Sequence, residues 1–351
     1  MTATSHPTLA WAATAPESGL APLTIDRRTL RDEDVAIDIA FCGVCHSDLH
    51  AARNDWGRTT YPFVPGHEIV GTVREVGAAV TKFAAGDRVA IGTIVDSCRK
   101  CDACADAEEQ YCREGMTGTY NAKDRVDGTT TYGGYSTSIV VAEPYVLRVP
   151  DGLDMARAAP LLCAGITTYS PLKNWNVGAG SRVGVIGLGG LGHMGVKFAK
   201  ALGAHVTIIT TSPEKGADAQ KLGADSVLVS TDKAAMKAAT RSFDFLLDTI
   251  PVAHDLMRYL LLLDRQGTLC IVGAIDMLPS FHSGLLLQGQ KAVAGSGVGG
   301  IAQTQEMLDL CAEKGILAEC EIIAMGDINA AFERMEKADV KYRFVIDMAT
   351  L

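Results

Sequence analysis

The sequence predicts an α/β protein in which a doubly wound parallel sheet is inserted into a second, β-rich domain. Three observations predict this fold: a turn-rich first part, an alternation of short apolar strands and helical patterns after about residue 150, and a tail with a different pattern. For a chain of 351 residues, two domains are the expected number. We expect the β-rich domain to cover 1–155 and 297–351, and the inserted domain to cover 156–296.

The first part has the texture of a small barrel or a folded sheet. Apolar and polar residues alternate over 35–40, as in a half-buried strand. Glycines then recur at Gly66, Gly71, Gly77 and Gly86, with short β-branched runs between them. Many short strands separated by tight turns produce this spacing.

The inserted part contains six short apolar runs with helical patterns between them. Parallel neighbours need long crossover connections, so this alternation predicts a parallel sheet. Apolar residues recur at helical spacing over 191–202. In the tail, the pattern predicts helices over 304–314 and 329–337 and a closing strand over 342–347. The six predicted strands are 183–186, 205–209, 226–229, 243–248, 268–273 and 292–295.

Charge and hydropathy exclude several classes of protein. The chain has 32 basic and 41 acidic residues, a net charge of −9, which argues against a general nucleic-acid binder. No stretch approaches the roughly 18 apolar residues that a membrane span needs. Residues 1–20 lack the basic and apolar regions of a secretory signal, so we expect a cytoplasmic protein.

Four of the ten cysteines lie in one short segment. In a chain without a secretory signal, this clustering favours metal binding over disulfides. Four thiolates form a closed tetrahedral set, which is typical of structural zinc. An iron–sulfur cluster is the alternative, because four thiolates also hold one. The four residues are Cys98, Cys101, Cys104 and Cys112.

A second set of metal-ligand types is dispersed along the chain. It consists of Cys45, His67 and Cys163. Two thiolates and one imidazole would leave the fourth position of a zinc ion open to water or substrate, as a Lewis-acid catalyst requires. Each residue alone is also compatible with a core or loop position, and their occurrence together with the other motifs favours a catalytic metal.

A glycine-rich turn follows the first strand of the inserted domain and opens its first helix. This context is the one required of a dinucleotide-binding motif, in which the diphosphate lies on the helix N-terminus. We expect Gly187 to make the tight turn, Gly189 to admit the diphosphate and Gly192 to let helix and strand pack closely. The motif is Gly187-Leu188-Gly189-Gly190-Leu191-Gly192.

The end of the second strand indicates which dinucleotide binds. NAD enzymes place an acidic residue there to hold the ribose 2′-hydroxyl, and here that position is Thr210. Three hydroxyls and one ammonium group would suit the 2′-phosphate of NADP, although an ordinary polar helix start, with Pro213 at its first position, has the same residues. The candidate phosphate contacts are Thr210, Thr211, Ser212 and Lys215.

Taken in order, these motifs resemble those of the zinc-dependent medium-chain alcohol dehydrogenases, and within them the cinnamyl alcohol dehydrogenases and bacterial NADP-dependent aldehyde reductases. The match covers nearly the whole chain. It includes Cys-Gly-Val-Cys-His-Ser-Asp-Leu-His at 42–50, Pro-Gly-His-Glu at 65–68, the cysteine segment 98–112, Leu-Leu-Cys-Ala-Gly at 161–165, Asp-Thr-Ile-Pro at 248–251 and Asp-Val-Lys-Tyr-Arg-Phe at 339–344.

The resemblance implies a GroES-like catalytic domain, an inserted Rossmann domain and a homodimer. It implies that Glu68 acts as an occasional fourth zinc ligand, that Asp48 orients the ligands, and that Ser47 and His50 relay the alcohol proton. It further implies that the cofactor contacts His46, Ser47, Thr167, Thr249, Gly273, Ser296, Gly297 and Val298.

The predicted activity is zinc-dependent hydride transfer between NADP(H) and a primary alcohol or aldehyde of aliphatic, benzylic or cinnamyl type, with two zinc ions per chain. A secondary-alcohol or polyol dehydrogenase is one alternative, although polyol members often have glutamate where this chain has Cys163. A non-catalytic, zinc-stabilised NADP-binding module is the other. The number of bound zinc ions separates the enzyme from the binding module.

Overall fold

The computed structural model describes residues 6–273 and 277–351, and the contacts within it divide the chain into two compact units. Unit 1 comprises Met1–Cys163 and Gly299–Leu351, and unit 2 comprises Ala164–Val298. Within the described residues, no helix has the length and apolarity needed to cross a membrane.

Unit 1 is built on a seven-stranded, mostly antiparallel sheet whose centre is β3 (Asp34–Val44). Val35, Ile37 and Ile39 on β3 are buried and Asp38 is exposed, as the predicted alternation requires, whereas Ala36 on the opposite face is also buried. The strand continues beyond the predicted 35–40 and ends at Val44, immediately before Cys45. The path of the sheet is β16 (Cys320–Ala324), β17 (Arg343–Asp347), β3, β4 (Ile69–Val76), β5 (Arg88–Ile91) and β9 (Leu147–Arg148), and β8 (Ser138–Ala142) also pairs with β3.

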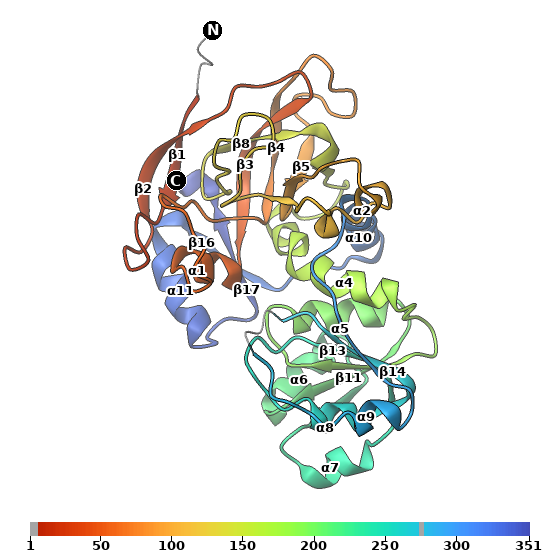
Figure 1. The fold of residues 1–351 in the computed structure, drawn as a ribbon. Helices are drawn as coiled ribbons and strands as arrows, with labels where there is room; N and C mark the ends of the chain where they lie inside the picture. Colours follow the sequence, from red (N-terminus) through yellow and green to blue (C-terminus); the bar gives the residue numbers. More distant parts are fainter. Residues whose placement is uncertain (1–5, 274–276) are drawn as a thin grey trace. The chain divides into compact units, whose positions relative to one another are not determined.

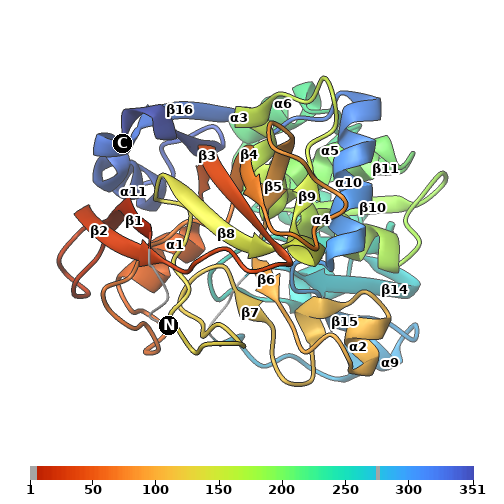
Figure 2. The same ribbon diagram turned by 90° about the horizontal axis from the view of Figure 1, so that it is seen from above.

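The C-terminal tail returns to unit 1, because β17 pairs antiparallel with β3 and parallel with β16. In both views of the ribbon, the blue C-terminal elements lie beside the red N-terminal strands (Figures 1 and 2). Figure 2 also shows β8 running alongside β3. The remaining elements of this unit are β1 (His6–Ala12), β2 (Ala21–Arg27), α1 (His46–Ala52), β6 (Ile94–Asp96), α2 (Asp102–Ala105), η1 (Glu109–Tyr111), β7 (Thr117–Gly118), η2 (Glu143–Tyr145), α3 (Met155–Ala158), η3 (Ala159–Leu162), α10 (Ile301–Lys314), η4 (Met325–Asp327), α11 (Ile328–Glu336) and η5 (Met348–Thr350).

Unit 2 is a parallel sheet of six strands in the order β12-β11-β10-β13-β14-β15, which confirms the predicted doubly wound fold. In Figure 1, α4 and α5 lie on one side of the sheet and α8 and α9 on the other. The strands are β10 (Arg182–Ile186), β11 (His205–Thr210), β12 (Ser226–Val229), β13 (Phe243–Asp248), β14 (Leu263–Ile271) and β15 (Ala292–Gly295). The helices are α4 (Ala164–Asn174), α5 (Gly192–Ala201), α6 (Pro213–Lys221), α7 (Lys233–Ala238), α8 (Met257–Leu260) and α9 (Gly284–Leu287).

Candidate metal centres and cofactor site

The structure brings the dispersed metal-ligand residues into one buried cluster in unit 1. Cys45 lies between β3 and α1, His67 and Glu68 precede β4, and Cys163 follows η3. One candidate ligand atom from each of these four residues lies within 4.8 Å of the others. Residues that are separated by more than a hundred positions in the sequence therefore converge on one point.

The carboxylate of Asp48 holds two of these residues in place. Asp48 is fully buried, and its Oδ1 accepts hydrogen bonds from Nδ1 of His67 at 3.0 Å and from the backbone N–H of Gly66 at 2.9 Å. Its Oδ2 accepts from the backbone N–H of Cys45 at 2.9 Å. A histidine that donates through Nδ1 keeps Nε2 as its metal-binding atom, and such outer hydrogen bonds fix the ring orientation of metal ligands.

The donor set of this cluster fits zinc. The sulfur atoms of Cys45 and Cys163 are 3.8 Å apart, and ligands about 2.3 Å from a tetrahedral zinc ion are separated by about 3.8 Å. The Cys163 thiol hydrogen-bonds to Cys45, and Arg343 and His67 lie nearby, so the pKa of Cys45 is held well below its ordinary value despite burial. A thiolate is the form that binds metal.

Glu68 adds a buried carboxylate to the same cluster. Its Oε1 accepts a hydrogen bond from Arg343, whereas its Oε2 has no partner among the described residues. Burial raises the pKa of Glu68 to about 7, although the charge of Arg343 opposes this. An orphaned buried oxygen among three ligand residues is compatible with a cation at this point.

The four clustered cysteines also converge. Their sulfur atoms lie within 4.8 Å of one another, with Cys98 and Cys104 at 3.8 Å and Cys101 and Cys104 at 3.5 Å. Backbone N–H groups donate to the sulfurs: Cys98 to Cys112 at 3.3 Å and Arg113 to Cys101 at 3.5 Å. The donation from Arg113 is the largest cause that lowers the pKa of Cys101 to about 6. These donors stabilise thiolates, as a four-thiolate metal site requires.

The candidate proton-relay residues lie on α1, directly after Cys45. His46 and Ser47 are its first residues, and Ser47 and His50 are three positions apart, so they lie on neighbouring turns of one face. Nδ1 of His50 lies 2.7 Å from Oδ2 of Asp55, a residue that the sequence motifs did not single out. An Nδ1–H donated to this carboxylate leaves Nε2 of His50 as a proton acceptor.

Two further residues at the metal cluster were missed by sequence reasoning. Arg343 lies within the quoted segment 339–344, but its partner Glu68 is 275 positions away. The ring of Tyr120 lies edge-on to His67, with the centroids 5.4 Å apart, and Phe63 packs edge-on against Tyr120 at 5.0 Å. These contacts come from the folding of unit 1 and leave no local signal in the sequence.

In unit 2, the candidate cofactor residues gather at the carboxyl edge of the sheet, where ligands bind in doubly wound folds. From β10 the chain continues to β11 and β12 on one side of the sheet, and then crosses to β13, β14 and β15 on the other side. The carboxyl end of β10 is therefore a topological switch point. Thr167 lies on α4, and His46 and Ser47 belong to unit 1. The others follow the strands directly: Gly187–Gly192 after β10, Thr210–Lys215 at the end of β11, Thr249 after β13, Gly273 after β14 and Ser296–Val298 after β15.

The three motif glycines have different steric reasons for lacking a side chain. Gly187 has φ of 91°, in the left-handed region that favours glycine. A Cβ on Gly192 would lie 2.0 Å from the carbonyl oxygen of Gly187, so helix and turn are in direct contact. A Cβ on Gly189 would meet nothing within 4 Å of protein, which leaves space for a ligand to approach its backbone. This cradle fits a diphosphate.

The turn after β11 combines hydroxyls with one acidic residue that the sequence reasoning did not weigh. Ser212 precedes Pro213 at the start of α6, and its backbone N–H donates to Oγ1 of Thr210 at 3.2 Å. The hydroxyl of Ser212 donates to Glu214 at 2.5 Å, and Lys215 is exposed. No carboxylate stands at Thr210 itself, so the turn can accept a 2′-phosphate, with Glu214 as a nearby opposing charge.

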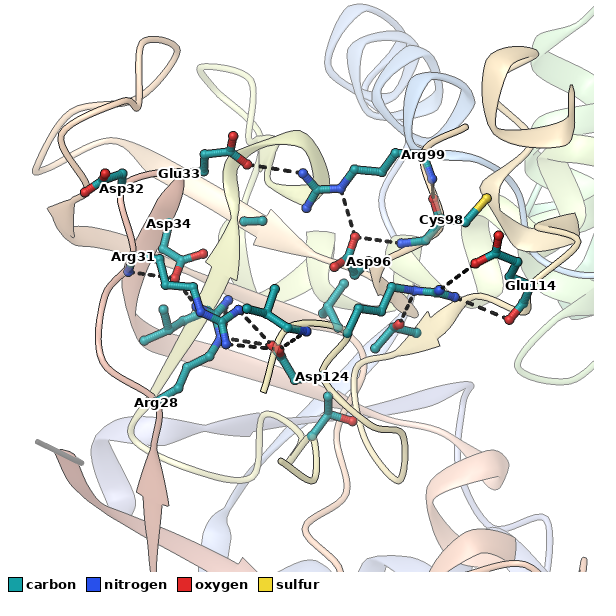
Figure 3. Close-up of a pocket in the computed structure, with 18 residues that line it drawn as sticks. Arg28, Arg31, Asp32, Glu33, Asp34, Asp96, Cys98, Arg99, Glu114 and Asp124 are labelled. Atoms are coloured by element: carbon teal, nitrogen blue, oxygen red, sulfur yellow. Dashed lines mark hydrogen bonds and ion pairs between the residues drawn. The ribbon is translucent and has the colours of Figure 1, made fainter. Parts of the chain in front are cut away.

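A separate pocket in unit 1, of about 530 Å³, is lined by charged side chains that pair with one another (Figure 3). Arg28 and Arg31 both contact Asp124, and Arg99 bridges Glu33 and Asp96. Of the predicted site residues, only Cys98 lines it among the described positions. The ion pairs of Arg99 attach the cysteine segment to the sheet.

Comparison with known proteins is consistent with this geometry. Residues 31–151 match the alcohol dehydrogenase GroES-like domain, and residues 190–313 match the zinc-binding dehydrogenase domain. The chain therefore belongs to the zinc-binding alcohol dehydrogenase family, whose members are oxidoreductases.

Individual relatives are similar over almost their whole length. The chain is 53% identical to aldehyde reductase YahK of Escherichia coli, covering 95% of each protein. It is 52% identical to NADP-dependent alcohol dehydrogenase C 1 of Mycolicibacterium smegmatis, covering 97% of this chain and 98% of the relative. The solved structure of CAD from Helicobacter pylori, complexed with NADP(H), matches with a TM-score of 0.92 and 38% identity, covering 99% of each chain.

Proposed function

We propose that this protein interconverts primary alcohols and aldehydes of aliphatic, benzylic or cinnamyl type with NADP(H). The proposal is carried by the buried cluster of Cys45, His67, Glu68 and Cys163, ordered by Asp48. It is supported by relatives that are named NADP-dependent alcohol dehydrogenase and aldehyde reductase. Unit 1 would be the catalytic domain and unit 2 the NADP-binding domain.

Two zinc ions per chain would be held by different residues for different purposes. Cys45, His67 and Cys163 would hold the catalytic ion, with Glu68 as a further ligand, and Cys98, Cys101, Cys104 and Cys112 would hold the structural ion. At the first site, zinc supplies a Lewis acid that polarises the substrate oxygen. Four thiolates leave no open position, so the second site would contribute to folding alone.

The residues of α1 would move the alcohol proton. Ser47 is the nearer of the two relay residues to Cys45 along the helix, and His50 lies one turn further on. Asp55 would hold His50 in the tautomer with Nε2 unprotonated, so that Nε2 can accept the proton from the Ser47 hydroxyl during oxidation and return it during reduction. NADP(H), when bound, would supply the hydride acceptor or donor for the substrate carbon.

The carboxyl edge of the sheet in unit 2 would bind the cofactor. The cradle at Gly187–Gly192 would hold the diphosphate, and Thr210, Thr211, Ser212 and Lys215 would hold the 2′-phosphate. Thr167, Thr249, Gly273 and Ser296–Val298 would contact the remainder, together with His46 and Ser47. For the residues that follow strands of unit 2, these roles are supported by their position at strand ends, whereas those of Thr167, His46 and Ser47 rest on the resemblance.

We also propose a homodimer in the cytoplasm. Strand β15 is at the end of the strand order in unit 2, and Ala292 and Gly295 on it are exposed, so its free edge can pair with a second copy. The two thiolate-containing sites require reduced cysteines, which cytoplasmic conditions maintain. Light scattering on the purified protein tests the dimer.

The enzymatic proposal is tested by a metal count and a substrate panel. Purified protein should contain two zinc ions per chain and should oxidise NADPH in the presence of aliphatic, benzylic or cinnamyl aldehydes. One zinc ion and no turnover would instead identify a binding module, and activity restricted to ketones or ketoses would identify a secondary-alcohol or polyol dehydrogenase.

A further inference from the structure

Arg27, the last residue of β2, is a buried cation that contacts only neutral groups. Its Nε donates to the carbonyl of Ser138 at 3.0 Å, Nη1 to the carbonyl of Tyr132 at 2.5 Å, and Nη2 to the carbonyl of Gly133 at 2.8 Å and to Oγ of Ser136 at 2.7 Å. All four acceptors belong to the segment 132–138. Burial lowers the pKa of Arg27 to about 9, so the guanidinium remains charged near neutral pH.

The neighbouring arginines, unlike Arg27, have carboxylate partners. Arg28 contacts Asp34 and Asp124, and the other arginines of the pocket in Figure 3 also have carboxylate partners. Among the described residues, no carboxylate lies within ion-pair distance of Arg27. A buried charge without a counter-ion costs free energy unless its hydrogen bonds are satisfied. The planar guanidinium here bonds three backbone carbonyls and one hydroxyl of a short segment, and its five donors in a fixed fork suit this arrangement.

The segment that Arg27 holds lies directly against the loop that carries His67. Gly133 donates to the carbonyl of Val64 at 2.9 Å, and Gly134 donates to that of Gly66 at 2.8 Å. A Cβ on Gly133 would lie 2.2 Å from the carbonyl oxygen of Pro65, so backbone packs on backbone without space between. The 132–138 segment therefore sets the position of the residues that precede His67.

The same segment reaches the carboxylate that orients the metal ligands. The hydroxyl of Tyr135 donates to Oδ2 of Asp48 at 3.4 Å, and Tyr135 donates through its backbone to Pro65 at 3.0 Å. Asp48 in turn accepts from His67 and Cys45. Arg27 thus holds the backbone on both sides of Tyr135, and Tyr135 in turn bonds the carboxylate that accepts from two candidate zinc ligands.

We propose that Arg27 is a positioning residue for the catalytic metal site: it clamps segment 132–138 against the His67 loop and so maintains the ligand geometry. This inference rests on the proposed function, because it requires zinc at Cys45, His67 and Cys163. Arg27 does not contact the metal ligands and acts only through the segment.

The test compares Arg27→Met with Arg28→Met in the full-length protein. Both variants remove one buried or half-buried arginine from adjacent positions, but only Arg27 contacts 132–138. We would measure the zinc content and the competition with a chromogenic chelator well below the unfolding temperature. Mass spectrometry would map which released cysteines become alkylated. Arg27→Lys is the conservative variant. NADPH binding reports on unit 2.

In Arg27→Met we expect zinc affinity at one site to fall about 10-fold, the lower end of the range for removal of a direct outer-shell partner, because Arg27 acts one step further from the ligands. Cys45 and Cys163 should become alkylated while Cys98–Cys112 stays protected, and NADPH binding should be unchanged. Arg28→Met should retain both ions even if its Tm falls. Arg27→Lys should restore part of the affinity, since an ammonium keeps the charge but makes fewer of the contacts.

Other outcomes would overturn the role. Retention of both ions at wild-type affinity in Arg27→Met, with a lower Tm alone, would make Arg27 an ordinary core residue. Loss of both ions together would indicate general unfolding, and if Arg27→Met does not fold, unchanged affinity in Arg27→Lys refutes the role. A wild-type protein with one zinc ion would refute the proposed catalytic site itself, whereas two ions with an unaffected variant refutes only the role of Arg27.

Discussion

Asp48 accepts a hydrogen bond from Nδ1 of His67 at 3.0 Å and, through its other oxygen, one from the backbone of Cys45 at 2.9 Å. One buried carboxylate thus orients two candidate zinc ligands that reach the cluster from different strands. Because both oxygens are in use, any replacement that lacks one acceptor disturbs at least one of these ligands.

Asp48→Asn should weaken zinc binding at this site about 10- to 100-fold, because an amide has one acceptor oxygen and carries no charge to support the imidazole. Chelator competition on the purified variant measures the change. Asp38→Asn is the matched control, since Asp38 lies on β3 but is exposed and pairs with Arg74. Equal zinc affinity in the two variants would contradict the orienting role of Asp48.

The two metal sites should respond differently to loss of one cysteine. Cys163→Ser should abolish turnover and leave folding and NADPH binding nearly intact, because the catalytic site is open and assembled from distant residues. Cys101→Ser should lower Tm by roughly 5 °C or more, because a closed structural site contributes directly to folding. Calorimetry and metal analysis measure both; an equal loss of stability in the two variants would refute this assignment of roles.

The relay predicts separate effects for its members. Ser47→Ala should reduce turnover about 10²-fold or more without loss of zinc, since Ser47 conducts a proton and holds no metal. His50→Gln should reduce the rate of alcohol oxidation less than Ser47→Ala does near neutral pH. Its effect should grow as the pH falls, because a base is then needed to accept the proton. Asp55→Asn should resemble His50→Gln, because under the proposed relay the carboxylate of Asp55 would favour the tautomer of His50 with Nδ1 protonated. A pH profile of kcat for each variant, with its zinc content, provides the check, and zinc loss in Ser47→Ala would show that its role is structural.

The sequence was sufficient for the fold class because its signals are local. Each strand of the inserted sheet is an apolar run, and 226–229, 243–248 and 292–295 were predicted with the observed bounds. Strand β14 was placed at 268–273 but spans Leu263–Ile271. Its first half contains Asp264, Arg265 and Gln266, which are typical of a loop, and Leu263 is held in the strand by pairing with Phe243. Only the tertiary structure supplies that partner.

In the candidate site, too, the residues with a local sequence signal were predicted and those whose partners are distant were not. Close spacing made the four-cysteine segment and the glycine motif visible, because the members of each lie within a few residues of one another in the sequence. Arg343 and Asp55 gave no such signal: a carboxylate five positions after His50 is unremarkable, and the partner of Arg343 is 275 positions distant. Arg27 was invisible for a further reason, since three of its four acceptors are backbone carbonyls, which every residue has.

Under the proposed function, the turn after β11 would set the cofactor preference, because Thr210 stands in place of the carboxylate of an NAD enzyme. A charge-assisted hydrogen bond to a phosphate contributes about 1.5–3 kcal/mol, so NADP should be preferred over NAD by about 10- to 150-fold in kcat/KM. Thr210→Asp should shift the preference toward NAD by repelling the phosphate. Comparable use of NADH and NADPH by the wild type with one substrate would contradict the assignment of a phosphate site.

Substitutions of Lys215 and Glu214 in the same turn should change KM for NADPH in opposite directions. Lys215→Ala should raise KM for NADPH and leave KM for NADH nearly unchanged, whereas Lys221→Ala, which removes an equal charge at the other end of α6, should change neither. Glu214→Gln should lower KM for NADPH about 2- to 5-fold, because it removes an exposed negative charge that binds Ser212 and opposes the phosphate. Initial-rate measurements with both cofactors at low and high salt separate these effects, since an exposed charge is screened by salt and a steric effect is not. If Lys215→Ala and Lys221→Ala raise KM for NADPH equally, the lysine contributes only to the general charge of the helix and the phosphate is held by the hydroxyls alone.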